Sequence, residues 1–236
     1  MELFCSSRNN NNSRYSSRNR LYVGEYKVMA NHVYFTISLD GIDDENFNKE
    51  VKMEEVTRKD YDGNDYTYKE LVELEHQPFM SKVEKRFDKD GELENSYDWY
   101  CNEIGAKWCH IDECQDGFIA GYSAWRQPHE LVLNLMEFYA NEYNTEVSAS
   151  MTYEDEFRNF MGKQYYGTVH DDGWSAWEGD YCETDGTELM EEFKELYPSI
   201  DADDEDFWYR EYEVEGEKIR PNEVIDELAD NFWSRC

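Results

Sequence analysis

Polar and apolar residues alternate without interruption over residues 32–39. Successive side chains of a strand point to opposite faces, so every second residue lies on the same side. The residues that would share the apolar side are Val33, Phe35, Ile37 and Leu39. Residues 32–39 are therefore predicted to form a strand with one buried face, which Asp40-Gly41 ends.

Helical spacing and a hairpin signal follow later in the chain. Gly105 supplies the left-handed residue that commonly ends a helix, and Asp116-Gly117 is a typical two-residue turn between strands. The elements predicted here are a helix at 92–104, strands at 107–113 and 117–125, a helix opened by Pro128, and a strand at 146–153.

These elements follow one another as strand, helix, strand, strand, helix, strand. That order predicts an α+β fold of the ferredoxin-like βαββαβ type, an antiparallel sheet with its helices on one face. The predicted segments are a disordered basic tail at 1–28, a ferredoxin-like domain at 29–182 with a long acidic insertion at 43–92, and an acidic extension of helices and strands at 183–236, packed on the same domain.

Further periodic stretches lie in the last third of the chain. They predict strands at 157–170 and 173–182, a helix at 187–196, an aromatic strand at 207–214 and a closing helix opened by Pro221. The pattern leaves open whether these elements extend the sheet or cap it.

Composition and charge narrow the classes of function. Aromatic residues make up 16% of the 236 residues, whereas disordered chains contain few of them. The net charge is −32; residues 1–28 hold five basic and two acidic residues, and the remaining 208 hold 18 basic and 53 acidic ones, a net charge of −35. Direct nucleic-acid binding is not expected, because it needs a positive surface, and a basic protein partner is favoured.

The start of the chain and the cysteines bear on location. Met29-Ala30-Asn31 stands directly before the first predicted strand, so translation is expected to start at Met29 and residues 1–28 to be absent from the natural protein. The alternative is that these residues tether the protein to nucleic acid or membrane.

The chain has no apolar run of the ~20 residues that a membrane span needs. We expect a cytoplasmic protein without cofactor whose cysteines are free thiols: Cys5, Cys101, Cys109, Cys114, Cys182 and Cys236.

Two blocks of sequence carry a family resemblance. Residues 99–108 read W-Y-x3-I-G-A-K-W, and residues 153–162 read Y-E-D-E-x3-F-x-G. Together with Met-Ala-Asn at 29–31 and a tryptophan shortly before the Pro128 helix, they resemble the YubB ferredoxin-like domain family of small phage and plasmid proteins, over residues 29–180. The resemblance implies the fold and brings no activity and no catalytic residues with it. The acidic insertion and the acidic last third depart from the family's pattern.

Three groups of residues suggest chemistry, and each has a simpler interpretation. Cys109, His110 and Cys114 suggest zinc, but strand alternation sends the first two to opposite faces. Residues 60–65 resemble a calcium loop but lack the glycine and glutamate positions of an EF-hand, and residues 170–173 form an ordinary turn sequence. No metal site and no enzymatic activity are therefore expected.

The most suggestive feature is an acidic run, D-A-D-D-E-D at 201–206 followed by E-Y-E-V-E at 211–215, where alternate carboxylates would share one face of a strand. The predicted binding residues are Asp203, Asp204, Glu205, Asp206, Glu211, Glu213 and Glu215.

The hypothesis drawn from this run is a non-enzymatic phage accessory protein whose acidic surface occupies a basic, nucleic-acid-binding site on a host protein, as a DNA mimic would. The alternatives are a carboxylate-based metal-dependent enzyme or small-ligand-binding protein, a self-associating structural protein, and a solvated sheet face without function.

Overall fold

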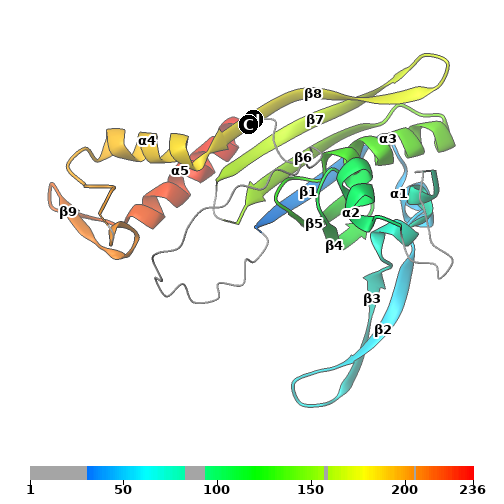
Figure 1. Ribbon diagram of the computed structural model, residues 1–236, viewed down its shortest axis with the longest axis horizontal. Coiled ribbons are helices and arrows are strands. Elements are labelled where there is room, and N and C mark those ends of the chain that lie inside the picture. Colours follow the sequence, from blue (N-terminus) through cyan, green and yellow to red (C-terminus); the bar gives the residue numbers. More distant parts are fainter. Residues whose placement is uncertain (1–30, 83–93, 157–158, 205) are drawn as a thin grey trace, which may run out of the picture. The chain divides into compact units, whose positions relative to one another are not determined.

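The centre of the fold is a sheet with the strand order β4-β5-β1-β6-β7-β8, in which every neighbouring pair is antiparallel (Figure 1). The structure is a computed structural model that describes residues 31–82, 94–156, 159–204 and 206–236. The strands of the sheet are β1 (His32–Asp40), β4 (Cys109–Gln115), β5 (Phe118–Ala124), β6 (Ser148–Asp155), β7 (Phe160–His170) and β8 (Trp174–Asp185). The protein is thus a mixed α/β protein with a large antiparallel sheet and several helices.

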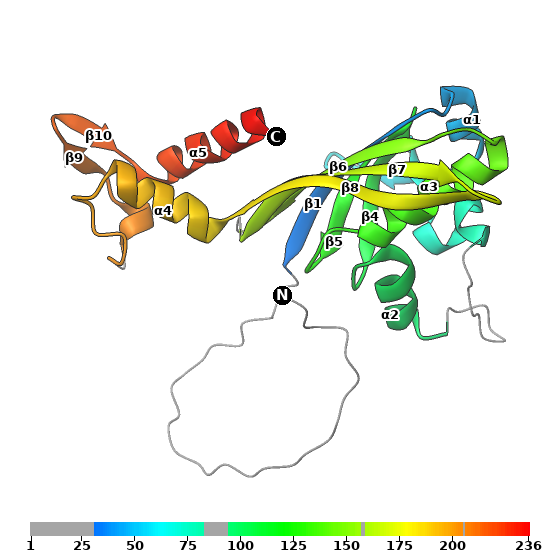
Figure 2. The same cartoon turned by 90° about the horizontal axis from the view of Figure 1, so that it is seen from above.

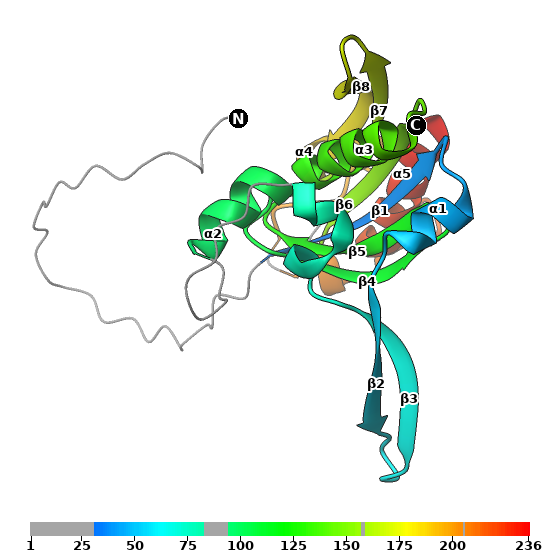
Figure 3. The same ribbon diagram turned by 90° about the vertical axis from the view of Figure 1, so that its right-hand side faces the viewer.

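One face of the sheet is covered by helices and forms the main core. The predicted alternation of β1 is confirmed, since Val33 and Ile37 are fully buried and Phe35 and Leu39 nearly so. Helix α3 (His129–Tyr143) contacts β6, β7 and β8 and packs into the same core (Figures 1 and 3). The period of the apolar residues thus defines both the strand and the helix that covers it.

The first residue of α3 ties the helix to the long β7–β8 hairpin. Nδ1 of His129 lies 3.1 Å from the hydroxyl of Tyr166 on β7, and Nε2 lies 2.8 Å from a carboxylate oxygen of Glu178 on β8. Burial raises the pKa of the Tyr166 hydroxyl, so the phenol stays protonated and can donate to the imidazole.

The turn between β4 and β5 follows the predicted Asp-Gly chemistry. Asp116 and Gly117 both adopt positive φ, +52° and +77°, as a tight hairpin turn requires. Strand β4 also has a shift of register between Ile111 and Glu113, which the sequence did not predict. Because of this bulge, Cys114 lies on the buried side, whereas simple alternation would have placed it with His110.

The predicted helix over 92–104 is found in part. It appears as α2 (Ser96–Trp99) followed by the π-helix η3 (Tyr100–Ile104), and residues 92–93 lie outside the described residues. The predicted stop is confirmed, because Gly105 has φ +86° and its N–H donates to the carbonyl of Tyr100 at 3.0 Å. A Cβ at Gly105 would also approach the backbone nitrogen of Glu130 to 3.0 Å, so glycine allows α3 to pack closely here.

The acidic insertion has secondary structure of its own. It contains α1 (Asp44–Lys49), the strands β2 (Met53–Lys59) and β3 (Asp65–Leu71), and the short 3-10 helices η1 (Leu74–His76) and η2 (Pro78–Lys82). β2 and β3 pair with each other in a separate antiparallel ribbon (Figure 3), and most of their side chains are exposed. The ribbon therefore receives little support from a core.

The last third both extends the sheet and builds a second core. β7 and β8 join the sheet, and the elements that follow are α4 (Gly186–Leu196), η4 (Phe207–Tyr209), β9 (Tyr212–Val214), β10 (Glu217–Ile219) and α5 (Pro221–Arg235). Figure 2 shows α4 and α5 beside the β9–β10 pair. The second core includes Phe193, Phe207 and Phe232 together with Met161 of β7, which links it to the sheet.

The predicted aromatic strand over 207–214 is wrong for its first half. Phe207–Tyr209 form the 3-10 turn η4, and only residues 212–214 are extended as β9. The side chain of Phe207 is buried in the second core, and the backbone N–H of Phe207 donates to the carbonyl of Asp204. Local turn bonds and burial of one ring thus prevail over strand propensity.

The expectation of free thiols is wrong for two of the six cysteines. Cys182 on β8 and Cys236 at the end of α5 form a disulfide across 54 residues of sequence. The chain brings them together only once α5 packs back toward the sheet, so their spacing carried no signal. Burial raises the pKa of Cys109, and it raises that of Cys114 to about 12, so neither side chain is a reactive thiolate near neutral pH.

No helix within the described ranges is long and apolar enough to cross a membrane.

Candidate functional site

Much of the acidic run is neutralised within the chain. The guanidinium of Arg210, which follows η4, lies 2.6 Å from a carboxylate oxygen of Asp204 and 2.8 Å from one of Asp206, both of which precede η4. The hydrogen bond to Asp206 and the charge of Asp204 raise the pKa of Arg210. Glu205 lies outside the described residues. Two of the predicted binding residues, Asp204 and Asp206, are therefore already paired with a cation of the same chain.

Glu211, Glu213 and Glu215 do not form the predicted row along a strand. β9 covers residues 212–214, and Glu215 lies in the turn to β10 with φ +54°. The carboxylate of Glu211 lies 2.6 Å from Lys218 and 3.1 Å from Arg220, and the hydrogen bond from Lys218 is the main reason why its pKa is lowered. Glu213 and Glu215 are exposed, and within the described residues neither has an ion pair.

Throughout the C-terminal segment, residues 186–236, some carboxylates have an ion pair and others are exposed without one. The segment has five basic residues, and each lies within ion-pair distance of a carboxylate. The pairs are Lys194–Asp203, Arg210–Asp204/Asp206, Lys218–Glu211, Arg220–Glu211/Glu223 and Arg235–Glu192. Exposed acidic residues without such a pair in the described structure are Glu188, Glu191, Glu195, Asp201, Glu213, Glu215, Glu217, Glu227 and Asp230.

Large aromatic side chains are exposed within this acidic segment. Trp208 is 48% exposed and Tyr209 is 90% exposed, although both lie in η4 next to the buried Phe207. Trp208 also lines a hollow of about 320 Å³ together with Leu189, Met190 and Ile225. Tryptophan and tyrosine contribute much of the binding energy of many protein interfaces, and here two such side chains are exposed within an acidic segment.

A second and larger hollow lies at the base of the β2–β3 ribbon. Its volume is about 690 Å³, and its walls come from the ends of β2 and β3, from η1, and from Tyr100 and the start of β4. Polar residues that line it include Lys52, Glu70 and His110. A hollow of this size is in the range of small-molecule sites.

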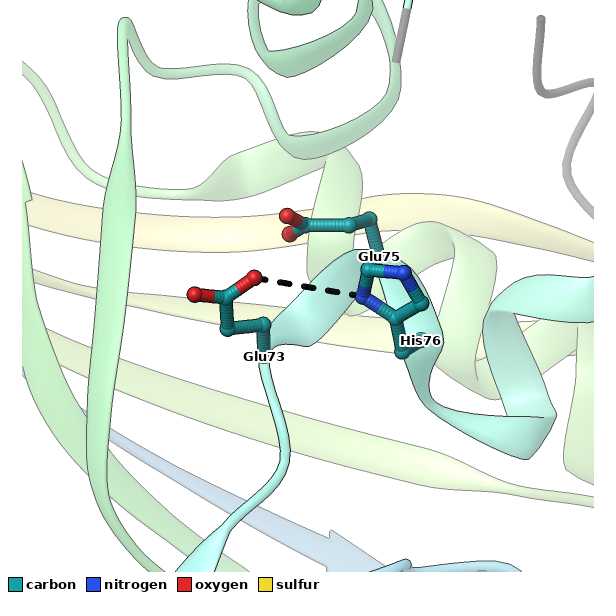
Figure 4. A group of neighbouring side chains, drawn as sticks. All are labelled: Glu73, Glu75 and His76. Atoms are coloured by element: carbon teal, nitrogen blue, oxygen red, sulfur yellow. Dashed lines mark ion pairs between the residues drawn. The ribbon is translucent and has the colours of Figure 1, made fainter. Parts of the chain in front are cut away.

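Three side chains with metal-ligand chemistry gather at this hollow. Glu73, Glu75 and His76 each offer one ligand atom, and these atoms all lie within 4.8 Å of one another. Figure 4 shows the three side chains leaving one short stretch of chain, with the carboxylate of Glu73 directed toward the ring of His76. Nδ1 of His76 lies 4.0 Å from a carboxylate oxygen of Glu73.

Buried neighbours hold the backbone of this group in place. Leu74, between the two glutamates, is 4% exposed and packs into the main core. Gln77, 1% exposed, accepts from the backbone N–H of Lys52 at 2.9 Å and donates to the carbonyls of Lys52 and Val72. The hydroxyl of Tyr100 donates to Glu75 at 2.8 Å.

The other residues that suggested chemistry have structural roles. Cys109 is buried and His110 exposed, with the imidazole of His110 3.3 Å from Asp112. In the loop after β2, the Asp60 carboxylate accepts from the backbone and side chain of Asn64, and these bonds lower its pKa. This is turn chemistry, as the sequence predicted.

Comparisons with protein-family models, with curated proteins and with solved structures find no match for this chain.

The group at 73–76 was missed at the level of sequence. The sequence signal is E-L-E-H at residues 73–76, and it matches no standard spacing of metal ligands. In a 3-10 turn, residues three apart lie on the same side, which brings Glu73 to His76. A strand interpretation of the same residues would have sent Glu75 and His76 to opposite faces.

Proposed function

We propose that this protein acts by binding a basic protein partner through its C-terminal segment, residues 186–236. One observation carries the proposal. All five cations of the segment are paired with carboxylates, and nine exposed acidic residues of the described structure remain there without an ion pair. The same segment exposes Trp208 and Tyr209. A basic surface would gain both charge pairing and an aromatic contact there.

The proposed partner is a host protein with a basic groove, such as one that normally holds nucleic acid. Residues 29–236 carry a net charge of −35. This charge opposes direct binding to phosphate backbones and accelerates the encounter with a positively charged surface. The binding residues favoured by the ion pairs are Glu213, Glu215 and Glu217 rather than Asp204, Asp206 and Glu211. In this proposal the protein is non-enzymatic and mimics the charge of DNA.

The ferredoxin-like class and the phage origin belong to the same proposal. The order β4-β5-β1-β6, with α2 before β4 and α3 between β5 and β6, agrees with a βαββαβ core to which β7 and β8 are added. The resemblance to the YubB ferredoxin-like domain family supports it through the blocks at 99–108 and 153–162.

The proposed location is the cytoplasm of an infected bacterium. A disulfide such as Cys182–Cys236 is more usual in oxidising compartments. Mass spectrometry of alkylated protein taken directly from cells tests the location, since a cytoplasmic chain should carry alkylated thiols at both positions.

The proposed binding is tested by capture of host proteins on the immobilised full chain at low salt, followed by elution with rising salt. We expect a basic protein whose retention weakens as salt screens the charges, and duplex DNA should displace it. The variant E213Q/E215Q/E217Q should elute at lower salt, and Trp208→Ala should release the partner faster.

The matched control removes three exposed carboxylates elsewhere, as E45Q/E55Q/E146Q, and has the same net charge as the first variant. If both triple variants elute together, the interaction depends on total charge and not on this segment. If no basic protein is retained, or if salt has no effect, the proposal is wrong.

The sequence also suggested a carboxylate-based metal-dependent enzyme or small-ligand-binding protein in the last third. The ion pairs of Asp204, Asp206 and Glu211 leave that segment poorly suited to hold a metal.

A further inference from the structure

We propose that Glu73, Glu75 and His76 form a binding site for a divalent cation of the zinc type, at the hollow between the β2–β3 ribbon and β4. The ligand atoms of the three side chains lie within 4.8 Å of one another, so small rotations of the side chains bring them onto one ion. Neither the fold nor the proposed partner binding requires this grouping.

The donor set selects the class of metal. Imidazole and carboxylate are both ligands of zinc, and zinc sites with three protein side chains keep one exchangeable position. Calcium and magnesium prefer oxygen donors alone, whereas imidazole suits zinc and other transition metals. His76 therefore separates this site from the many carboxylate groups of so acidic a chain.

The site is held ready by its surroundings. Leu74 anchors the turn in the main core, and the side chain of Gln77 bonds to the backbone of Lys52 and Val72, which adjoin the base of β2 and of β3. The hydroxyl of Tyr100 donates to one oxygen of Glu75 and leaves the second oxygen available to a metal. Such a bond fixes the orientation of a ligating carboxylate, so Tyr100 is a positioning residue.

The hollow gives a bound ion room for further ligands. Its volume of about 690 Å³ exceeds what one ion and its waters occupy, and Lys52 and His110 line other parts of its wall. With three protein ligands, the metal would keep at least one open position, where water or an anionic small molecule could bind.

The test is a calorimetric titration of the metal-free full chain with zinc, in the presence of excess calcium to occupy weak carboxylate sites. We expect one zinc ion per chain, with perturbed NMR signals of the His76 imidazole. His76→Ala and E73Q/E75Q should each weaken zinc binding by about tenfold or more, and Tyr100→Phe should weaken it by about tenfold.

The matched control is E45Q/E55Q, which removes the same charge as E73Q/E75Q from exposed positions outside the group. Circular dichroism of each variant separates loss of the site from loss of the fold. The proposal is overturned if zinc binds at many weak sites, if the control weakens binding as much as E73Q/E75Q, or if His76→Ala leaves affinity unchanged. These outcomes are independent of the partner-binding experiment.

Discussion

Gln77 is a polar side chain that is almost fully buried at the base of the β2–β3 ribbon. Its amide satisfies one backbone N–H and two backbone carbonyls, on Lys52 and Val72. An exposed ribbon has little core of its own, so the bonds at its base decide how firmly it is attached.

Replacing Gln77 by alanine should lower the free energy of unfolding by about 1–3 kcal/mol, because three backbone groups lose a partner where water is largely excluded. Urea denaturation followed by circular dichroism measures the change. Gln115→Ala is the control, since Gln115 is exposed and bonds to an exposed glutamate. Equal effects of the two substitutions would contradict this role of Gln77.

At the residue scale, the sequence predicted positions that follow a period and missed those that depend on a single contact. Val33 and Ile37 were predictable because alternation alone places them in the core. The burial of Cys114 was not, because it depends on a bulge, and the ion pairs of Arg210 were not, because they depend on a 3-10 turn. The group at 73–76 depends on such a turn as well.

At the scale of elements, the sequence predicted the positions of several strands correctly but did not predict which strands pair. The predicted strands at 32–39 and 146–153 correspond to β1 and β6, within two residues at each end. The ribbon of β2 and β3 was not predicted, because its alternation is mostly polar on both faces. Whether β7 and β8 extend the sheet depended on long-range pairing, which periodicity does not carry.

The disulfide between Cys182 and Cys236 connects the sheet to the end of α5, so its loss should destabilise mainly the C-terminal segment. C182S/C236S should lower the free energy of unfolding by about 2–4 kcal/mol, because the unfolded chain regains the freedom of a long closed loop. Thermal unfolding and amide exchange of α4 and α5 measure the effect. Reductant should reproduce it in the parent chain and leave C182S/C236S unchanged; a parent insensitive to reductant would contradict it.

At the scale of the whole molecule, buried hydroxyls make stability depend on alkaline pH. Burial raises the pKa of Tyr100, Tyr139 and Tyr153, and burial with a hydrogen bond to Glu50 raises that of Tyr143 to about 12. In the unfolded chain tyrosine loses its proton near pH 10. Between these values the unfolded state holds fewer protons than the folded state, so unfolding becomes more favourable as pH rises.

We therefore expect stability to be constant with respect to these groups below about pH 9, and to fall as the pH rises from 10 toward 12. Tyrosinate absorbance and circular dichroism followed together against pH test this, since the buried tyrosines should ionise as the fold is lost. Tyr143→Phe should have a shallower dependence. Ionisation of all the tyrosines near pH 10 with the fold intact would show that these hydroxyls are accessible.

The bulge in β4 has a consequence for the behaviour of the protein in concentrated solution. β4 is an edge strand, and an edge presents free N–H and C=O groups on which another chain can add a strand. The shift of register between Ile111 and Glu113 interrupts that row, and the exposed charges of Asp112 and Glu113 repel a second acidic copy. The irregularity that moves Cys114 into the core thus also protects this edge against aggregation.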